Sequence, residues 1–372
     1  MRRSYNYILK KQLMRGRIFW PFSQLLKYIG IYLGHKIQTP ISGPIHAVIF
    51  ATYACNLNCV FCNYPEKHIL KKRAGLRELS TQEMKNVISD LHRLNTTVAA
   101  FTGGEPVLRK DIHELIEFAA RKQMLTHLST NGYAFRNKEE TRKLFESGLD
   151  ATSISIDSPY EEIHDAIRGK KGNFKQVMTA IENVRTYKER TKKRVSLTTT
   201  TVINEENADS IPALIELLKD AGIEQIGFIP DHDFGDNYTN ENREKYFAKR
   251  NNRLLETIDF LIDYALKEPV IENTVEYLRL FKNYYNGEPL PIPCYAGYAT
   301  IAVDSWGEIY PCFTYSMLER SFANIRAVSL LDFWKSERAQ CMREKSSACR
   351  ECYWNNQTEI NLMFSKFDYK RV

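Results

Sequence analysis

Between about Ala47 and Pro230, short apolar runs alternate regularly with amphipathic stretches. The apolar runs have the length and composition of buried strands, and the stretches between them have helical periodicity. The predicted strands are Ala47–Thr52, Thr97–Thr102, Leu125–Thr130, Ala151–Ile156, Val195–Val202 and Gln225–Pro230. The predicted helices lie near residues 81–94, 111–122, 138–147, 173–190 and 210–221. A capping box, Ser80 followed three residues later by Glu83, marks the start of the first helix.

This alternation predicts an α/β fold. Strand, helix and strand in regular succession favour parallel pairing through right-handed crossovers. Six such units predict a partial (β/α)6 parallel barrel, with its functional residues at the carboxyl ends of the strands.

After Pro230 the pattern changes. A polar loop leads into a charged helical region over 241–285, which Pro269 interrupts. Alternating residues at Ala299–Val303 and Ile309–Tyr310, separated by a glycine turn, predict a hairpin, and a last helix is expected near 329–345. The predicted units are an N-terminal arm (1–45), the barrel (46–232), a helical connector (233–285) and a small C-terminal β-hairpin and helix domain (286–372).

Composition is that of a globular protein, with 43% apolar and 26% charged residues, but the charge is unevenly distributed. The first 65 residues contain eight Lys or Arg and no Asp or Glu, so the net charge of +7 belongs to this segment. Bulky apolar residues are interleaved with these cations, which favours helices on an anionic membrane surface. A helical lid with solvated lysines stays an alternative. No apolar run approaches the ~20 residues that span a bilayer, and we expect no nucleic-acid partner, because no binding module accompanies the charge.

The eight cysteines form two groups that are more than two hundred residues apart. This distribution is not that of a disulfide framework, and the basic N-terminus lacks the apolar core and cleavage site of a signal peptide. We therefore expect reduced thiols in the cytoplasm, where clustered thiols bind metal.

The first group, Cys55, Cys59 and Cys62, directly follows the first predicted strand. Three thiolates on one loop can hold three corners of a cubane iron–sulfur cluster. The absent fourth ligand leaves one iron open, whereas a structural zinc ion takes four protein ligands.

This C-x3-C-x2-C spacing, with Phe61 before the third cysteine, resembles the signature of the radical S-adenosylmethionine (SAM) superfamily. The resemblance implies that SAM chelates the open iron of a [4Fe-4S] cluster. It also implies that an electron donor such as flavodoxin or ferredoxin reduces the cluster, so that SAM is cleaved to a 5′-deoxyadenosyl radical.

Further motifs of the same family follow in order at the strand ends. Gly103-Gly104-Glu105-Pro106 matches its GGEP motif, in which the glycines permit close backbone approach and the carboxylate accepts from the SAM ammonium. The resemblance implies further SAM contacts at Ser129, Asn131, Ser155, Asp157 and Arg168. It places Thr200, Val202 and 228–230 along the adenine and substrate side. Ordinary turn chemistry, a solvated arginine and strand core are the alternative interpretations.

A second constellation consists of Cys294, Cys312, Cys349 and Cys352. It resembles the twitch domain, a shortened SPASM domain, which implies a fully ligated auxiliary [4Fe-4S] cluster on these four residues. A four-cysteine zinc knuckle is the alternative, although only Cys349 and Cys352 have the knuckle spacing. Cys341 lies on the predicted last helix and is expected to be a buried small hydrophobe.

The predicted activity is cleavage of SAM and abstraction of hydrogen from a substrate, with a net oxidation if the auxiliary cluster accepts an electron. A small carbohydrate, alcohol or lipid-linked intermediate is the first candidate, and a ribosomally made peptide the second. A non-catalytic zinc-binding scaffold is the third possibility. On the loop after the sixth strand, Asp231, His232 and Asp233 are candidates for removing a substrate proton; a solvated acidic loop is the alternative.

Overall fold

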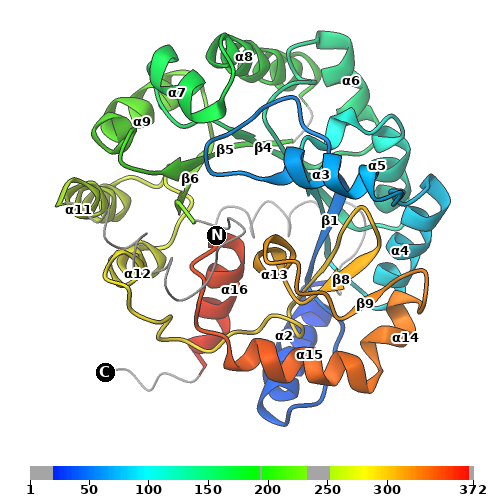
Figure 1. The fold of residues 1–372 in the computed structure, drawn as a ribbon. Helices are drawn as coiled ribbons and strands as arrows, with labels where there is room; N and C mark the ends of the chain where they lie inside the picture. Colours follow the sequence, from blue (N-terminus) through cyan, green and yellow to red (C-terminus); the bar gives the residue numbers. More distant parts are fainter. Residues whose placement is uncertain (1–19, 193–194, 233–251, 368–372) are drawn as a thin grey trace.

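The computed structural model describes residues 20–192, 195–232 and 252–367. In this part of the chain, nine strands form one sheet in the order β6-β5-β4-β3-β2-β1-β7-β8-β9. The first six strands are mutually parallel, and helices surround them on the outside (Figure 1). The strands are β1 His46–Thr52, β2 Val98–Gly103, β3 Leu125–Thr130, β4 Ala151–Ser155, β5 Ser196–Ile203, β6 Gln225–Pro230, β7 Thr300–Val303, β8 Glu308–Tyr310 and β9 Ala323–Asn324. The predicted α/β barrel architecture is confirmed.

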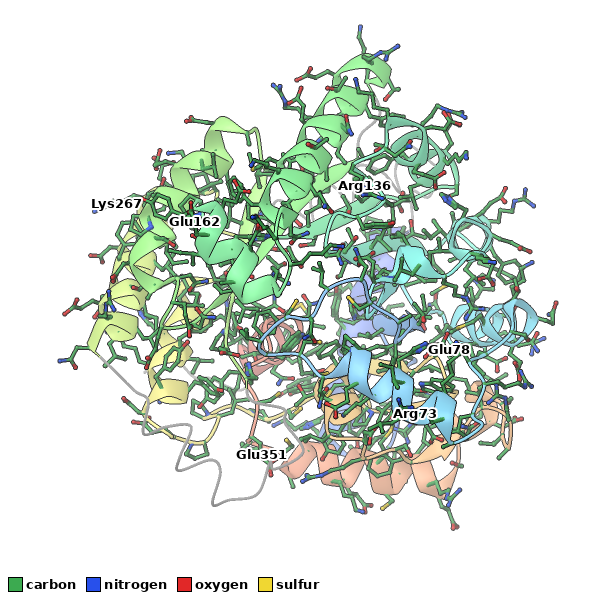
Figure 2. All side chains as sticks on the ribbon, turned by 45° about the horizontal axis from the view of Figure 1, so that its top comes forward. Arg73, Glu78, Arg136, Glu162, Lys267 and Glu351 are labelled. Carbon is green, nitrogen blue, oxygen red and sulfur yellow. The ribbon has the colours of Figure 1, made fainter. Side chains whose placement is uncertain are left out.

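The helices between the strands carry their apolar faces against the sheet. The described helices are α2 Trp20–Lys36, α3 Tyr64–Arg73, α4 Thr81–Arg93, α5 Ile112–Arg121, α6 Lys138–Glu146, α7 Glu161–Arg168, α8 Asn173–Thr191, α9 Ile211–Asp220, α11 Asn252–Lys267, α12 Val275–Tyr285, α13 Phe313–Met317, α14 Leu330–Trp334, α15 Glu337–Ala348 and α16 Asn355–Ser365. Charged residues such as Arg136, Glu162 and Lys267 lie on the outer surface (Figure 2). None of the described helices is both long and apolar enough to cross a membrane.

The local predictions hold where the periodicity is strong. The six strands agree with the predicted ranges to within one residue, and α4 begins with the expected capping box. The sequence pattern did not predict α3 or α7. Half of the residues of α3 are charged, and the helix buries only Tyr64 and Lys67, so it has no apolar stripe to detect.

The C-terminal hairpin continues the barrel sheet. Strand β7 pairs in parallel with β1, with Ala47 opposite Ile301, and β8 pairs antiparallel with β7. The predicted hairpin is therefore present, and it joins the edge of β1. The two ends of the hairpin, which lead to Cys294 and Cys312, therefore lie toward the amino end of β1, whereas the turn of the hairpin lies beside the chain that leaves β1.

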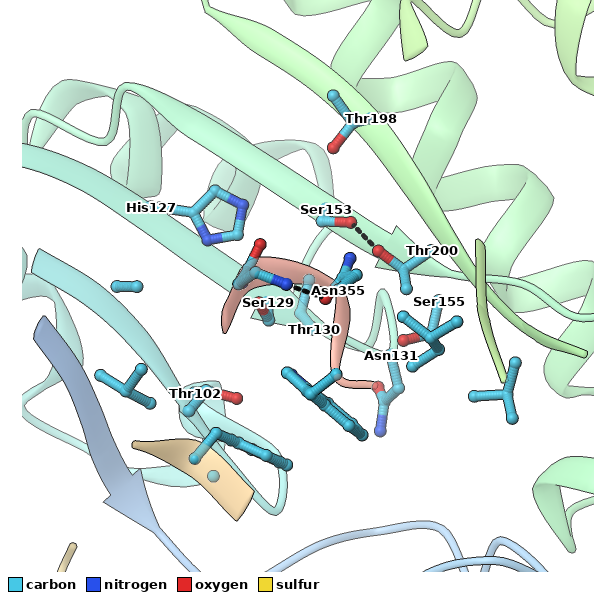
Figure 3. A pocket seen from close by; sticks show the side chains of 18 of the residues that line it. Thr102, His127, Ser129, Thr130, Asn131, Ser153, Ser155, Thr198, Thr200 and Asn355 are labelled. Carbon is cyan, nitrogen blue, oxygen red and sulfur yellow. Dashed lines mark hydrogen bonds between the residues drawn. The ribbon is translucent and has the colours of Figure 1, made fainter. Parts of the chain in front are cut away.

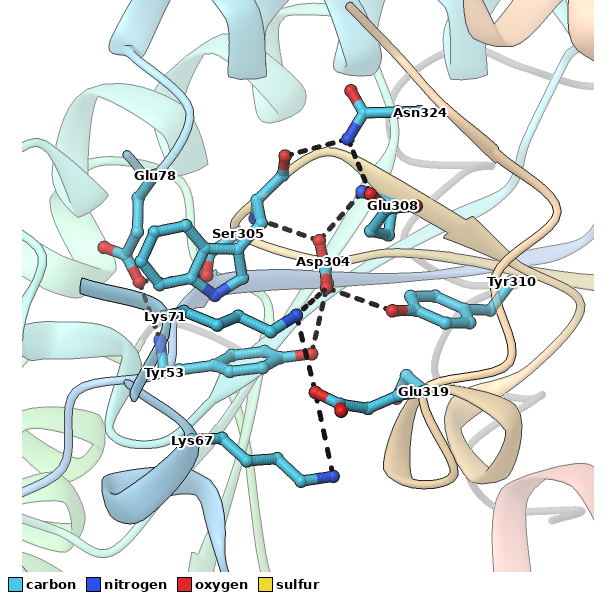
Figure 4. A network of polar contacts seen from close by, with 12 residues as sticks. Tyr53, Lys67, Lys71, Glu78, Asp304, Ser305, Glu308, Tyr310, Glu319 and Asn324 are labelled. Carbon is cyan, nitrogen blue, oxygen red and sulfur yellow. Dashed lines mark hydrogen bonds and ion pairs between the residues drawn. The ribbon is translucent and has the colours of Figure 1, made fainter. Parts of the chain in front are cut away.

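A buried polar network fastens the hairpin to α3 (Figure 4). Asp304, in the turn between β7 and β8, accepts hydrogen bonds from the hydroxyls of Tyr53 (3.1 Å) and Tyr310 (3.2 Å) and pairs with Lys71 at 3.9 Å. Burial raises the pKa of Asp304, and the positive charge of Lys71 opposes that rise. Because Lys71 lies on α3, directly after the first cysteine group, the network couples this loop to the C-terminal region.

The prediction for Cys341 was wrong. Its side chain is exposed on α15. The buried positions of that helix include Ala339, Met342 and Ser346, so Cys341 lies on another face. The sequence of α15 has no clear apolar stripe, and only packing determines which side turns inward.

Glu359 joins α16 to the start of α12 and provides a pH-dependent contact. Its carboxylate accepts from the amide (2.7 Å) and the hydroxyl (2.9 Å) of Thr274. Burial raises its pKa from the ordinary value of 4.5 to about 7, although the Thr274 hydrogen bonds lower it. The folded state thus favours the protonated form, and this contribution is complete below pH 4.5 and lost as pH rises to about 7.

We therefore expect the free energy of unfolding to fall by about 3 kcal/mol over this range because of Glu359 alone. Glu359→Gln keeps an acceptor for Thr274 without the charge, and should lose that part of the pH dependence. Urea unfolding at pH 5 and pH 8 measures the difference. The exposed Glu344→Gln is the matched control and should behave like wild type. Equal pH dependence of Glu359→Gln and wild type would contradict the assignment.

Candidate functional site

The loop after β1 brings the first three cysteines to one cavity at the carboxyl ends of the strands. Cys55, Cys59 and Cys62 are half-buried and all line this cavity. Burial, with a smaller contribution from the neighbouring thiols, raises the pKa of Cys55 to about 11 and that of Cys62 to about 12. Three neighbouring thiols on one wall can act as the ligands of an iron–sulfur cluster. Binding to iron deprotonates them, because the metal takes the thiolate form.

The C-terminal end of α7 holds this loop in place. The amide of Val60 donates to the carbonyl of Ile167 (3.0 Å), and the ammonium of Lys170 donates to the carbonyl of Asn56 (3.2 Å). Gly169 has a φ of +63°, and a Cβ there would lie 2.0 Å from the carbonyl oxygen of Asn58. Only glycine accommodates both the left-handed backbone and this close approach.

The Gly-Gly-Glu-Pro turn packs against the chain that leads into the cysteine loop. The amide of Gly104 donates to the carbonyl of Thr52 and that of Glu105 to the carbonyl of Ala54, both at 2.8 Å. A Cβ on Gly104 would approach the Ala54 oxygen to 2.3 Å, so the glycine is required for backbone contact. Gly103 and Gly104 also line the cavity.

Glu105 lies fully buried behind the cavity wall. Its carboxylate accepts from the hydroxyl of Thr130 (2.8 Å) and the amide of Asn131 (2.7 Å). Burial raises its pKa to about 7, and the hydrogen bonds from Asn131 and Thr130 lower it. Asn131 lines the cavity, donates to the side-chain oxygen of Asn56 (2.8 Å) and reaches Cys55 Sγ at 4.0 Å. Glu105 thus orients a residue that faces the cysteines, and Pro106 is likewise buried outside the cavity lining.

Arg168 connects a buried carboxylate to the cysteine loop. Its Nε lies 2.6 Å from Asp157 Oδ2, and its Nη1 lies 3.9 Å from Cys59 Sγ. The guanidinium also stands 5.3 Å from the ring centre of Phe61. Burial by itself lowers the pKa of Arg168, but the charges of Asp157 and Cys59 raise it above its usual value. With 7% of its surface exposed, Arg168 is not the solvated arginine of the alternative interpretation.

The second group of cysteines lies beside the same cavity. Cys294, Cys312 and Cys352 are buried and Cys349 is half-buried. Burial raises the pKa of each thiol, and the other thiols of the group add to the rise at Cys294, Cys312 and Cys349. Cys312 also lines the cavity that holds the first group. Next to it, the rings of Phe313 and Trp354 stack at 4.3 Å.

No group of three or more His, Cys, Asp or Glu side chains in the described ranges is close enough to bind a single metal ion. A cubane cluster takes one protein thiolate at each of its iron atoms, and so needs ligands that are farther apart than those of one ion. The two groups of thiols fit that wider arrangement: the first three line one cavity, and within each group neighbouring thiols raise a pKa, that of Cys62 in the first group and that of Cys294 in the second.

The cavity has a volume of about 410 Å³ and runs through the barrel from the cysteine loop to the first residues of the strands. Polar side chains form part of its wall (Figure 3): Ser153 and Thr200 share a hydrogen bond of 2.7 Å, and His127 and Thr198 line the wall beside them. The sequence-predicted residues that line it, besides the cysteines and glycines, are Phe61, Ser129, Asn131, Ser155, Arg168, Thr200, Val202, Ile229, Pro230, Asp231 and His232. Phe228 packs in the hydrophobic core instead, and Asp157 lies behind the wall.

The three proposed proton-transfer residues have different surroundings. Asp231 is half-buried at the cavity. His232 is buried, accepts from the amide of Tyr353 (3.2 Å) and donates from its other nitrogen to the carbonyl of Pro230 (2.8 Å). Burial lowers its pKa to about 4, so it is a neutral residue that joins β6 to the C-terminal region. Asp233 lies outside the described residues.

The sequence motifs do not indicate the part of the cavity wall that the C-terminal region contributes. Trp354, Asn355, Asn356 and Gln357 line the cavity, as does Glu272 between α11 and α12. The only available signal was that the first four directly follow Cys352. Their approach to the barrel depends on the pairing of β7 with β1, which no local pattern reveals.

Comparison with known proteins agrees with this geometry. Residues 49–218 match the radical SAM superfamily, and residues 294–353 match the iron–sulfur cluster-binding SPASM domain. Together the two matches cover more than half of the chain, and they contain both groups of cysteines. The chain belongs to the radical SAM superfamily. Its cofactors are those of the two domains, SAM and [4Fe-4S] clusters.

Two curated relatives of this chain have names that describe different reactions. An Fe-coproporphyrin III synthase of Methanosarcina barkeri is 36% identical over 177 residues, which are 48% of this chain and 41% of the relative. Mycofactocin maturase MftC of Mycolicibacterium smegmatis is 35% identical over 152 residues, which are 41% of this chain and 37% of the relative. The chain thus spans about two-fifths of the length of these curated relatives.

The fold of this radical SAM protein is also found in solved structures. Streptococcus suis SuiB, crystallised with the precursor peptide SuiA, superimposes with a TM-score of 0.60 at 16% identity, over 89% of this chain and 78% of SuiB. SuiB has also been crystallised with SAM. At this identity the likeness concerns the fold.

Proposed function

We propose that this protein cleaves SAM reductively and abstracts a hydrogen atom from a substrate held inside the barrel. The observation that carries the proposal is that Cys55, Cys59, Cys62, the Gly103–Gly104 turn and Arg168 all face one cavity. When bound, a [4Fe-4S] cluster on the three thiols supplies the electron that cleaves SAM to a 5′-deoxyadenosyl radical, with flavodoxin or ferredoxin as its proposed source.

The chain's own residues position SAM. The exposed backbone of Gly103 and Gly104 permits close approach, and Ser129, Asn131 and Ser155 offer hydrogen-bonding groups around the same wall. Arg168 supplies a cation for the SAM carboxylate, and Asp157 holds that cation in place. Glu105 acts mainly through Asn131, because its carboxylate is already engaged with Thr130 and the Asn131 amide.

The four C-terminal cysteines would hold an auxiliary [4Fe-4S] cluster. Four protein ligands leave no open position, which suits electron transfer. Cys312 lines the substrate cavity, so an electron can leave a substrate radical there. The proton released at the same time has an acceptor in Asp231, which lines the cavity. Loss of one hydrogen atom, one proton and one electron makes the net change in the substrate a two-electron oxidation.

For the substrate, the first candidate is a small carbohydrate, an alcohol or a lipid-linked intermediate. The supporting observation is a group of polar side chains in the cavity wall: the hydroxyls of Ser153, Thr198 and Thr200 line the cavity together with His127. Such groups can pair with substrate hydroxyls and discriminate against apolar molecules, which would leave them unpaired.

A ribosomally made peptide is the second candidate. It is favoured by the fold shared with SuiB, a protein crystallised with a precursor peptide. The different names of the two curated relatives show that membership in the superfamily does not specify a substrate.

The proposed activity predicts 5′-deoxyadenosine as a product. Protein reconstituted anaerobically with iron and sulfide is incubated with SAM and dithionite, together with deuterated sugar alcohols or peptides. We expect 5′-deoxyadenosine that contains deuterium only with the correct substrate class, because the radical takes its hydrogen from that molecule. Heat-denatured protein is the control. Zinc in place of iron at the first three cysteines would instead favour a zinc-binding scaffold and contradict the proposal.

A further inference from the structure

Helix α2 presents an apolar stripe to solvent. Phe22, Leu25, Leu26, Ile29 and Leu33 follow one another at spacings of one, three and four residues and lie on one side of the helix. Their exposed fractions range from 43% to 61%. A helix that packs on a globular core normally turns such a stripe inward. In α2 the stripe faces outward, and exposed Ile37 and Ile41 extend it beyond the end of the helix.

Polar contacts on the opposite side hold α2 in this orientation. Gln24 is buried and accepts from the hydroxyl of Thr97 (2.8 Å), and buried Lys27 donates to the carbonyl of Asn95. At the other end, His35 bonds to the carbonyl of Cys294 (3.1 Å) and stacks on Tyr295 at 4.1 Å. Rotation of α2 to hide the stripe would bury apolar groups only by breaking these contacts.

Apolar packing reinforces the same orientation. Ile31 is fully buried against Ile45 and Tyr298, and the ring of Tyr28 lies 5.9 Å from that of Phe364 on α16. In Figure 1, α2 (blue) lies on the same side of the molecule as α16 (red), which carries Phe364. The outward stripe is therefore a stable feature of the surface, and a contiguous apolar patch of this kind marks a site of protein or membrane contact.

The charge of the sequence around α2 favours contact with a membrane over contact with a protein. The chain contains no Asp or Glu before Glu66, and eight Lys or Arg precede it, six of them before the start of α2 at Trp20. An apolar stripe can enter the acyl layer of a membrane, and a neighbouring segment with only cationic charges attracts anionic lipid headgroups. Protein interfaces more often place aromatic side chains and arginine at the centre, with hydrogen bonds across it.

We propose that α2 lies flat on the surface of an anionic lipid membrane, with Phe22, Leu25, Leu26, Ile29 and Leu33 among the acyl chains. Helix α2 bonds to Asn95 and Thr97, which precede β2, so the membrane-facing side lies at the amino ends of the strands. The cysteine loop at the carboxyl ends remains accessible, and the proposal is independent of the catalytic function.

Vesicle binding tests the proposal. The full-length protein is sedimented with vesicles of equal parts phosphatidylglycerol and phosphatidylcholine, and with vesicles of phosphatidylcholine alone. We expect binding to the anionic vesicles to be at least about tenfold stronger and to weaken in high salt. Leu26→Glu/Ile29→Glu should reduce this binding by at least about tenfold, because two carboxylates would enter the apolar layer.

Leu266→Glu is the matched control, because Leu266 is equally apolar and 64% exposed but lies on α11. It should bind vesicles like wild type. Failure of wild type to bind anionic vesicles, or binding that Leu26→Glu/Ile29→Glu leaves unchanged, would overturn the proposal. So would a wild-type dimer that dissociates in this double variant, which would show that a second copy covers the stripe. A lower melting temperature of the variant without vesicles would show that the chain itself covers it, with the same consequence.

Discussion

Replacing Cys59 with alanine is expected to abolish SAM cleavage, lowering 5′-deoxyadenosine formation by about 10³-fold or more. The cluster site would keep only Cys55 and Cys62, and two thiolates do not hold a cubane with one open iron. Cys59 is the most informative of the three because its thiol also lies 3.9 Å from Arg168, whose charge favours the thiolate. Iron content and 5′-deoxyadenosine in anaerobically reconstituted protein measure the effect.

The matched control is Cys341→Ala. Cys341 is an exposed thiol on α15, outside both groups of cysteines. We expect this variant to keep the iron content and the SAM cleavage of wild type. Wild-type iron and activity in Cys59→Ala, or equal losses in both variants, would contradict the assignment of the cluster loop.

Removing the carboxylate of Asp157 is expected to destabilise the protein by about 3–5 kcal/mol, because it leaves Arg168 buried with its main counter-charge gone. Asp157 also accepts from the amide of Val202 at 3.0 Å, so the same change leaves a buried donor on β5 without that partner. Urea unfolding of cluster-free Asp157→Ala, compared with cluster-free wild type, measures the change.

Two further variants separate the buried charge from a general loss of packing. Asp157→Leu/Arg168→Met removes both charges and should recover part of the stability lost in Asp157→Ala. Glu182→Ala removes the partner of Arg185 in an exposed ion pair on α8 and should leave the unfolding midpoint almost unchanged. If Asp157→Ala were no less stable than Glu182→Ala, the pair would not have the structural role that its burial indicates.

Much of the barrel was readable from local patterns. The six parallel strands and α4, α5, α6, α8 and α9 follow from the periods of apolar residues and from capping at Ser80, which act over a few neighbouring residues. The spacing of Cys55, Cys59 and Cys62 was readable for the same reason, since one short loop carries all three ligands.

Residues that belong to the same sequence motifs have different roles in the structure, because long-range packing determines which of them face the cavity. Ser129 and Asn131 face the cavity, whereas Glu105 and Asp157 lie behind it and hold Asn131 and Arg168. A motif shows that a polar residue stands at a strand end. Whether its side chain reaches the cavity depends on the neighbours that already occupy its hydrogen-bonding groups.

Local patterns were enough to predict the six parallel strands, most of the helices between them, the position of the cysteine loop and the cationic character of the N-terminal segment. The folded structure was needed to show that β7 extends the sheet from β1, that the residues after Cys352 complete the cavity wall, and that the apolar side of α2 faces outward. The reason is physical: periodicity and spacing act within a segment, whereas strand pairing and the orientation of a helix depend on contacts between residues that are far apart in the chain.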